Sequence, residues 1–194
     1  RLDVFLLHRD DLAFPVEAFA DALLAEVSAG RLGAFGVSNW TIERTRELAA
    51  YVDGVAPGRL VAFSNHFSLA EMVEAPWPGC LAVTHDEIDE LGRLGLRMLA
   101  WSSLATGYFA GRNAPSWESE ENEGRRDRAR ELAAHHGVSA TTIALAYVLA
   151  QPEHVLPVVG TGSIGHLDEA LAAADVELSR DEVAWLEAGV GVPS

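Results

Sequence analysis

The sequence contains no lysine, because all fourteen of its basic residues are arginines. A chain without lysine cannot form a Schiff base with a carbonyl substrate, and it cannot use a lysine to lower the pKa of a neighbouring tyrosine. Basic residues are also outnumbered, since 29 Asp and Glu residues give a formal net charge of −15. Nucleic-acid binding depends largely on clustered Lys and Arg, so we exclude a nucleic acid as partner.

Cysteine and long hydrophobic runs are scarce as well. Cys80 is the only cysteine, which excludes an internal disulfide and agrees with a reducing compartment. Hydrophobic residues make up 49% of the chain, yet no run is long enough to cross a bilayer and the N-terminus lacks the zones of a signal peptide. We therefore expect a cytoplasmic protein that does not associate with a membrane.

Short hydrophobic runs that end in polar or small residues are the main positive signal. There are five of them: Asp3–His8, Phe35–Trp40, Leu60–His66, Met98–Ser103 and Val155–Gly160. Amphipathic helical patterns separate them, for example at Val16–Ala29 and Thr41–Val52. Strands that alternate with helices predict parallel βαβ units, and α/β enzymes bind ligands at the carboxyl ends of such strands.

The second half of the chain predicts more helices and one polar loop. The helices are expected at Asp86–Leu94, Arg125–His136, Thr141–Gln151, Ile164–Ala174 and from Ser179, where a capping-box pattern begins. The acid-rich segment Ala114–Glu123 predicts a mobile loop on the ligand side or a solvated connection.

Several motifs in a fixed order carry a family resemblance. They are DVFLLHRDD, GRLGAFGVSNWT, LAWSSLATGYFAGR, ATTIALAYVL, and LPVVGTG followed by DVELSRDEVAWLE. Over essentially the whole chain this series resembles the C-terminal part of an aldo-keto reductase, from barrel strand four to the end. The loop EAPWPGC ahead of LAWSSLATGYFAGR is similar to reductase modules fused behind another oxidoreductase domain.

The resemblance implies an α/β fold, the (β/α)8 TIM barrel, of which this chain supplies about the second half. Residues 1–194 would form a single incomplete domain containing strands 4 to 8 with their helices, because a closed barrel typically takes about 250 residues. The chain also starts directly in a strand-like run. We expect a missing N-terminal half, absent or supplied by another chain. Because the chain alone would expose apolar strand edges, we expect it to pair with that half or to self-associate.

The resemblance assigns His8 as the active-site histidine that polarises the substrate carbonyl. A neutral imidazole at the end of a strand can donate a hydrogen bond to developing alkoxide charge, which fits that role. The alternative is a histidine whose hydrogen bonds are satisfied by backbone groups at the barrel rim.

Ser38 and Asn39 match the pair that holds the nicotinamide carboxamide in this family, since together they supply a donor and an acceptor. The alternative is that they cap the following helix. Ser64 occupies the position of a family glutamine that completes this clamp, although its side chain is shorter.

Trp101 matches the aromatic residue that stacks on the nicotinamide; the alternative is a core tryptophan. Ser102, Ser103 and Leu104 match the loop whose backbone lies along the cofactor pyrophosphate, a role that depends on main-chain N–H groups.

The turn Gly160–Gly165 spells G-x-G-x-x-G between a strand and a helix. A Rossmann fingerprint is excluded because too little chain follows it. The family comparison instead assigns Gly160, Thr161, Gly162 and Ser163 to an anion site for a cofactor phosphate, with a simple tight turn as the alternative.

This region also departs from the family pattern. Gly162 and Ala170 stand where a basic residue and an asparagine commonly bind the adenosine 2′-phosphate and adenine. His166 and Glu169 remain as adenine-side contacts. The expected cofactor is therefore NADP or NAD, with weak discrimination between them. No metal is expected, because Glu131 and His135 lie one helical turn apart without a third ligand.

The function implied is NAD(P)H-dependent reduction of aldehydes or ketones by the intact protein, acting on a small-molecule carbonyl substrate. The family's tyrosine acid, its lysine and its aspartate precede the histidine, and none of Tyr51, Tyr108 and Tyr147 matches the acid. Two alternatives stay open: a catalytically incompetent barrel that binds cofactor or a partner, and another barrel enzyme that uses the terminal turn for a substrate phosphate.

Overall fold

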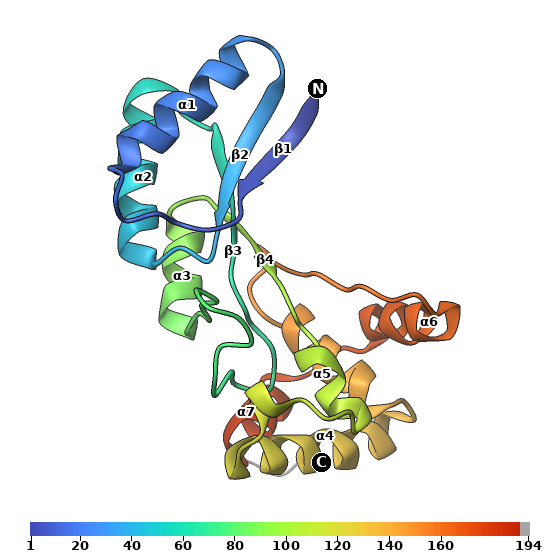
Figure 1. The fold of residues 1–194 in the computed structure, drawn as a ribbon. Coiled ribbons are helices and arrows are strands. Elements are labelled where there is room, and N and C mark those ends of the chain that lie inside the picture. The colour runs from blue at the N-terminus through green and yellow to red at the C-terminus, as the bar shows by residue number, and fades with distance from the viewer. Residues whose placement is uncertain (191–194) are drawn as a thin grey trace. The chain divides into compact units, whose positions relative to one another are not determined.

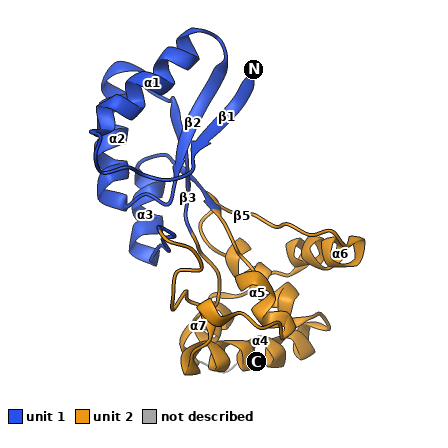
Figure 2. Ribbon diagram, in the orientation of Figure 1, with its two compact units in different colours: residues 1–65, 79–99 blue, residues 66–78, 100–194 orange. Residues whose placement is uncertain are grey.

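A computed structural model describes residues 1–190 and divides into two compact units (Figure 2). Unit 1 comprises residues 1–65 and 79–99, and unit 2 comprises residues 66–78 and the chain from Ala100 onward.

Unit 1 is built of parallel strands with helices between them (Figure 1). Its strands are β1 (Leu2–Leu7), β2 (Leu32–Ser38), β3 (Leu60–Ser64) and the first residues of β4 (Arg97–Ala100). Its helices are α1 (Val16–Ser28), α2 (Ile42–Val55) and α3 (His85–Arg93). The strands pair in chain order and all pairs are parallel, which confirms the βαβ prediction.

Close strand packing in unit 1 depends on two glycines of β2. A Cβ atom at Gly33 would lie 2.5 Å from the carbonyl oxygen of Asp3 on β1, and one at Gly36 would collide with the carbonyl of Ala62 on β3. Phe35 and Val37, which alternate with Gly36, are fully buried. Strand β2 thus combines large core side chains with glycines where a neighbouring backbone approaches closely.

Unit 2 is mainly helical. Its long helices are α4 (Glu120–His136), α5 (Ala140–Leu149), α6 (Ile164–Ala172) and α7 (Arg180–Ala188). Shorter elements are η1 (Ala105–Ala110), η2 (Pro115–Trp117), η3 (Ala173–Asp175) and strand β5 (Val155–Pro157). Helix α5 is its centre, since seven consecutive residues from Thr142 to Val148 are buried. A helix buried all round is hydrophobic all round, as this one is.

The segment 114–123 was predicted as a mobile loop or a solvated connection, and this prediction is wrong for Trp117, which is buried, and for residues 120–123, which are helical. Trp117 is only 2% exposed. Helix α4 begins at Glu120 after Ser119, whose hydroxyl accepts a hydrogen bond from the backbone N–H of Asn122. The acidic residues fall in the first turn of α4, where carboxylates interact favourably with the helix dipole. The negative charge of these residues therefore favours the start of a helix, although the sequence prediction interpreted it as a sign of a loop.

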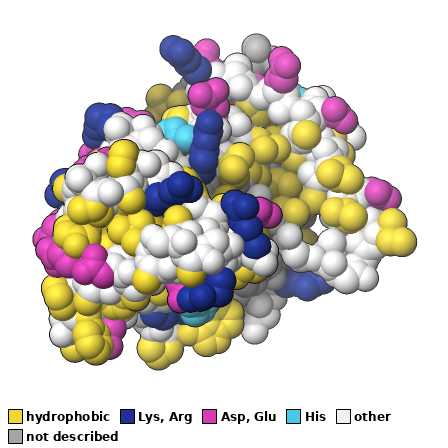
Figure 3. All heavy atoms as spheres, turned by 90° about the horizontal axis from the view of Figure 1, so that it is seen from above, with side chains coloured by type: hydrophobic (Ala, Val, Ile, Leu, Met, Phe, Trp, Pro, Cys, Tyr) yellow, Lys and Arg dark blue, Asp and Glu magenta, His cyan; other side chains and the backbone are white. Residues whose placement is uncertain are grey.

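Hydrophobic side chains reach the surface in several places (Figure 3). In unit 1 they include Leu2, Val4 and Phe5 of β1, which are 57%, 45% and 40% exposed. Within residues 1–190, no single helix is long and apolar enough to cross a membrane. Helices α4 and α5 meet that test of length and composition only when joined across a 97° bend.

Candidate functional site

The polar residues predicted at the strand ends of unit 1 lie together. The Asn39 side-chain amide donates to the Ser38 hydroxyl at 2.9 Å and to the backbone carbonyl of His8 at 3.4 Å. The Ser38 hydroxyl donates in turn to the Ser64 carbonyl at 2.8 Å. Ser38, Asn39 and Ser64 are buried whereas His8 is exposed, so the histidine ring is the part of this cluster most open to a ligand.

Asn39 occupies a strained backbone position, with φ of 57°. Its own N–H donates to the Asn65 side-chain oxygen at 2.7 Å, and its side-chain oxygen accepts from the Leu81 N–H at 3.1 Å. Helix α2 is capped by Thr41, whose hydroxyl accepts from the Arg44 N–H at 3.3 Å. The alternative reading, that Ser38 and Asn39 cap this helix, is therefore wrong.

Asn65 is a polar residue at this site that the sequence prediction missed. It is 2% exposed and its amide donates to the Trp40 carbonyl at 3.0 Å. The signal was present, because Ser64-Asn65 repeats at the end of β3 the Ser38-Asn39 pair at the end of β2.

In unit 2, a buried histidine holds the backbone of Trp101. His66 is 1% exposed; its Nδ1 lies 3.2 Å from the Trp101 carbonyl, and its Nε2 accepts from the Trp117 indole N–H at 3.1 Å. A carbonyl can only accept, so the proton sits on Nδ1. Burial lowers the pKa of His66 to about 4, which keeps the ring neutral at pH 7.

Trp101 is half-buried, and its ring centroid lies 5.1 Å from that of His66. Its indole nitrogen is buried without a hydrogen-bond partner among the described residues. His66 therefore supports one side of a tryptophan whose polar atom has no partner within residues 1–190. Stacking of this ring on a nicotinamide stays a prediction.

The loop after β4 has an unusual backbone. Ser102, Ala105 and Thr106 have φ of 50°, 47° and 55°, although none is a glycine. Such positions typically cost about 1–3 kcal/mol each and concentrate at ligand sites. The Ser103 hydroxyl donates to the Val158 carbonyl at 2.9 Å and fixes the loop to the chain that leaves β5.

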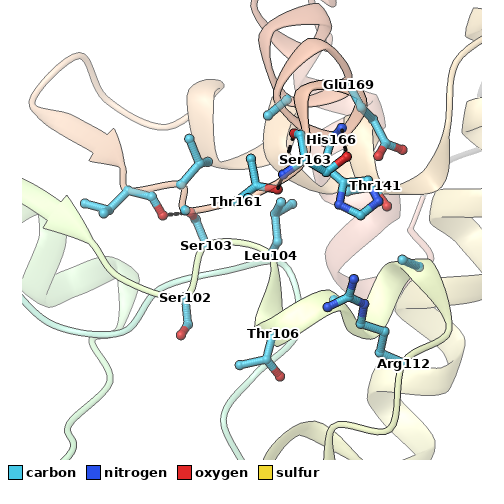
Figure 4. Close-up of a pocket in the computed structure, with 17 residues that line it drawn as sticks. Ser102, Ser103, Leu104, Thr106, Arg112, Thr141, Thr161, Ser163, His166 and Glu169 are labelled. Carbon is cyan, nitrogen blue, oxygen red and sulfur yellow. Dashed lines mark hydrogen bonds between the residues drawn. The ribbon is translucent and has the colours of Figure 1, made fainter.

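A cavity of about 730 Å³ in unit 2 gathers most of the residues predicted to bind the cofactor (Figure 4). This volume lies within the usual range for small-molecule sites, about 300–1,000 Å³. The lining comes from the loop after β4, η1, α5, the turn after β5 and α6: Ser102, Ser103, Leu104, Thr106, Gly107, Ala110, Arg112, Thr141, Val158, Val159, Gly160, Thr161, Gly162, Ser163, His166, Glu169 and Ala170.

The glycine-rich turn forms one wall of this cavity and leads into α6. Ser163 caps the helix, accepting from the His166 N–H at 3.4 Å, and the Thr161 hydroxyl accepts from the Ser163 N–H at 3.1 Å. A Cβ atom at Gly160 or Gly162 would meet no atom within 4 Å. The glycines thus leave free space beside a helix N-terminus, where backbone N–H groups and the helix dipole favour an anion.

The cavity wall carries two charged side chains, Arg112 and Glu169, which differ in how the protein holds them. Arg112 lies across Gly107, whose φ of 95° and missing side chain make room for it, since a Cβ there would lie 2.6 Å from the arginine Cδ. Glu169 of α6 accepts a hydrogen bond from the hydroxyl of Ser139, the N-cap residue of α5. The Glu169 carboxylate is therefore fixed by the protein, while Arg112 points its guanidinium into the space that Figure 4 shows.

The hydroxyl of each of the three tyrosines is either hydrogen-bonded to a carboxylate or buried. Tyr51 donates to Asp21 at 2.8 Å, and this bond raises the pKa of its hydroxyl. Burial raises the pKa of Tyr108 and of Tyr147, and Tyr147 also donates to Glu187 at 2.6 Å. Residues 1–190 contain no group of three or more His, Cys, Asp or Glu that could hold a metal ion.

Comparison with known proteins identifies the family. The model of the Aldo/keto reductase family matches residues 1–189. The chain belongs to this family. It is 29% identical over 187 residues to 6-dehydroglucose reductase of Novosphingobium aromaticivorans, covering 93% of this chain and 54% of that protein. It is 28% identical to the aldo-keto reductase dtxS3 of Metarhizium robertsii, covering 96% and 52%.

Solved structures agree with the fold of this aldo/keto reductase chain. A Klebsiella pneumoniae aldo/keto reductase in complex with NADP and acetate superimposes with a TM-score of 0.74 at 23% identity, over 98% of this chain and 59% of that one. The α/β fold of the (β/α)8 type is thereby confirmed. The chain spans about half the length of the curated relatives it matches.

Proposed function

We propose that the protein containing this chain is an NAD(P)H-dependent oxidoreductase that reduces aldehydes or ketones. The observation that carries the proposal is the unit 2 cavity, in which the loop after β4 and the glycine turn before α6 line one space. The family match and a structural neighbour that binds NADP support a dinucleotide as the ligand.

The residues of the cavity fit such a cofactor. Gly160 and Gly162 leave space that side chains would fill, the α6 N-terminus attracts anions, and Arg112 adds a positive charge. Here the phosphates would lie against residues 102–104 and 160–163, with His166 and Glu169 towards the adenine. When bound, the cofactor supplies a hydride to the carbonyl carbon.

The remaining roles fall to strand-end residues. Within unit 2, Trp101 would support the nicotinamide ring. Within unit 1, Ser38, Asn39 and Ser64 are the residues that the family resemblance assigns to the carboxamide. The Asn39 oxygen already accepts from Leu81, so a carboxamide would use its second lone pair. The exposed ring of His8 would donate a hydrogen bond to the substrate oxygen as negative charge develops there.

A complete enzyme also needs a proton donor for the substrate oxygen and a partner for the exposed edge of strand β1. The tyrosines of this chain are unsuited to proton donation, because their pKa values are raised and no lysine is present. Exposed Leu2, Val4 and Phe5 lie on β1, which pairs with β2. We propose that residues 1–194 form part of one barrel domain, completed at β1 by further βα units or by a second copy.

The second candidate is a catalytically incompetent module that binds cofactor or a partner. The absence of lysine from the sequence and the raised pKa values of the tyrosines favour it for the chain alone. Turnover by the whole protein distinguishes the two candidates.

The first test uses the whole protein, titrated with NADH and NADPH while tryptophan fluorescence is followed. Replacing Arg112 with alanine should weaken binding of both cofactors by about tenfold, since a charge-assisted contact is lost. Arg130→Ala is the matched control, because Arg130 pairs with Asp127 on α4 and does not line the cavity.

Catalysis is tested with His8→Gln and a panel of aldehydes. This variant should keep cofactor binding and lose on the order of 100-fold in kcat. If the whole protein binds neither cofactor, the proposal fails. If it binds cofactor but reduces no carbonyl substrate, the non-catalytic candidate replaces it.

A further inference from the structure

The charge of the unit 2 cavity is low for a dinucleotide site. Among the described residues that line it, Arg112 and Glu169 are the only Asp, Glu, Lys or Arg residues, and their formal charges cancel. A dinucleotide brings two negative charges on its pyrophosphate, and a 2′-phosphate adds about 1.5 to 2 more near pH 7. The arginine and one helix N-terminus can balance the pyrophosphate, which leaves no arginine of the lining and only the imidazole of His166 for a further phosphate.

The turn itself offers no cation. Its residues from Gly160 to Ser163 are glycine, threonine, glycine and serine, and Arg112 comes instead from the chain that follows η1 and its C-cap residue Gly111. A side chain at Gly162 would have open space, since no atom lies within 4 Å of its Cβ position, and its φ is not in the left-handed region. Nothing steric therefore prevents a basic residue here, and its absence leaves the turn without a cationic side chain.

Glu169 adds a fixed negative charge. Its carboxylate accepts a hydrogen bond from Ser139, and its backbone carbonyl accepts from the Thr142 hydroxyl at 3.3 Å. These bonds hold it in the cavity wall, where it repels a phosphate dianion and can accept a hydrogen bond from a ribose hydroxyl.

We propose that this cavity selects NAD(H) over NADP(H), and that Gly162 and Glu169 set the preference. The inference rests on the proposed function, since it assumes a dinucleotide in the cavity. It concerns binding, so it does not require that the protein be catalytically active.

The test compares dissociation constants of NADH and NADPH for the whole protein by tryptophan fluorescence at 0.1 M salt. NADH should bind about tenfold more tightly than NADPH. Gly162→Arg should tighten NADPH binding about tenfold more than it tightens NADH binding, because the 2′-phosphate of NADPH gains a partner that NADH lacks. Glu169→Gln, which keeps an acceptor for Ser139, should tighten NADPH binding several-fold.

A matched control separates local from global charge. Gly54→Arg adds the same charge at an exposed glycine of α2 that also has no atom within 4 Å of its Cβ position, and it should leave both affinities unchanged. Wild-type protein that binds NADPH as tightly as NADH overturns the inference and leaves the proposed function intact. Binding of neither cofactor overturns both. Gly162→Arg that acts no differently from Gly54→Arg overturns the role of Gly162, and Glu169→Gln tests the other residue separately.

Discussion

At the scale of single residues, His66 is expected to make the fold sensitive to acid. Its folded pKa of about 4 lies below the unfolded value of 6.5, so protons bind the unfolded state more tightly. The contribution of the neutral His66 ring to the free energy of unfolding is fully present above pH 6.5 and is lost as the pH falls towards 4. Between pH 7.5 and 5 the loss should be about 2 kcal/mol. Urea unfolding at the two pH values measures it.

The control for this prediction is His66→Asn, which keeps a donor for the Trp101 carbonyl but does not titrate. Other groups titrate in both proteins, so the informative quantity is the difference in unfolding free energy between wild type and variant. This difference should shrink by about 2 kcal/mol on acidification. Equal pH dependence in the two proteins would mean that His66 takes up a proton in the folded state as easily as in the unfolded one.

The positions of Ser38 and Asn39 could be predicted from the sequence, whereas the contacts of His66 could not. Ser38 and Asn39 were predicted at the end of a strand and lie together there, because parallel strands end at one edge. The hydrogen bonds of His66 to Trp101 and Trp117 span 35 and 51 residues. No local pattern signals a contact between residues so far apart along the chain.

At the scale of elements, the strained 3-10 segment η1 gives a prediction about stability. Thr106 is exposed and β-branched, and its φ of 55° suits glycine far better. Thr106→Gly should relieve this strain and raise the unfolding free energy by up to about 1 kcal/mol, less the extra chain entropy of glycine. Thermal and denaturant unfolding provide the measurement.

Gly111, the C-cap residue of the same element, supplies the converse test. Its φ is 78° and no atom lies within 4 Å of its Cβ position, so Gly111→Ala tests backbone strain without a clash. It should lower stability by about 1 kcal/mol. Thr106→Ala keeps the strain and should gain nothing. A gain as large in Thr106→Ala as in Thr106→Gly would assign the effect to the threonine side chain instead.

Element boundaries were predictable where a cap residue stood before a hydrophobic pattern, as at Thr41 and Ser179. The start of α4 was missed because charge was taken as a sign of solvated loop. Ser119 followed by glutamates is itself a helix-start signal, and the prediction from acidic composition did not take it into account. The tight packing of Trp117 beneath the same segment depends on tertiary contacts alone.

At the scale of the whole molecule, the parallel α/β architecture follows from the alternation of strand and helix patterns, and the family match confirms it. The strands of unit 1 pair in the order in which they occur along the chain. This order could be anticipated, since one helix lies between each two consecutive strands. The left-handed backbone at Asn39 could not be anticipated, because its N–H is held by the side chain of Asn65, a contact that only the folded chain provides.

The last prediction is that residues 1–194, purified by themselves, do not reduce carbonyl substrates. The chain has no lysine, the hydroxyls of Tyr108 and Tyr147 are buried with raised pKa values, and Tyr51 donates to Asp21. A general acid works best when its pKa lies near the working pH. The pKa of each of these tyrosines is raised, away from neutral pH. The measurement follows oxidation of NADH and NADPH with reactive aldehydes, using the whole protein as positive control. Turnover that accompanies the chain through purification and disappears in His8→Ala would show that residues 1–194 supply a proton donor of their own.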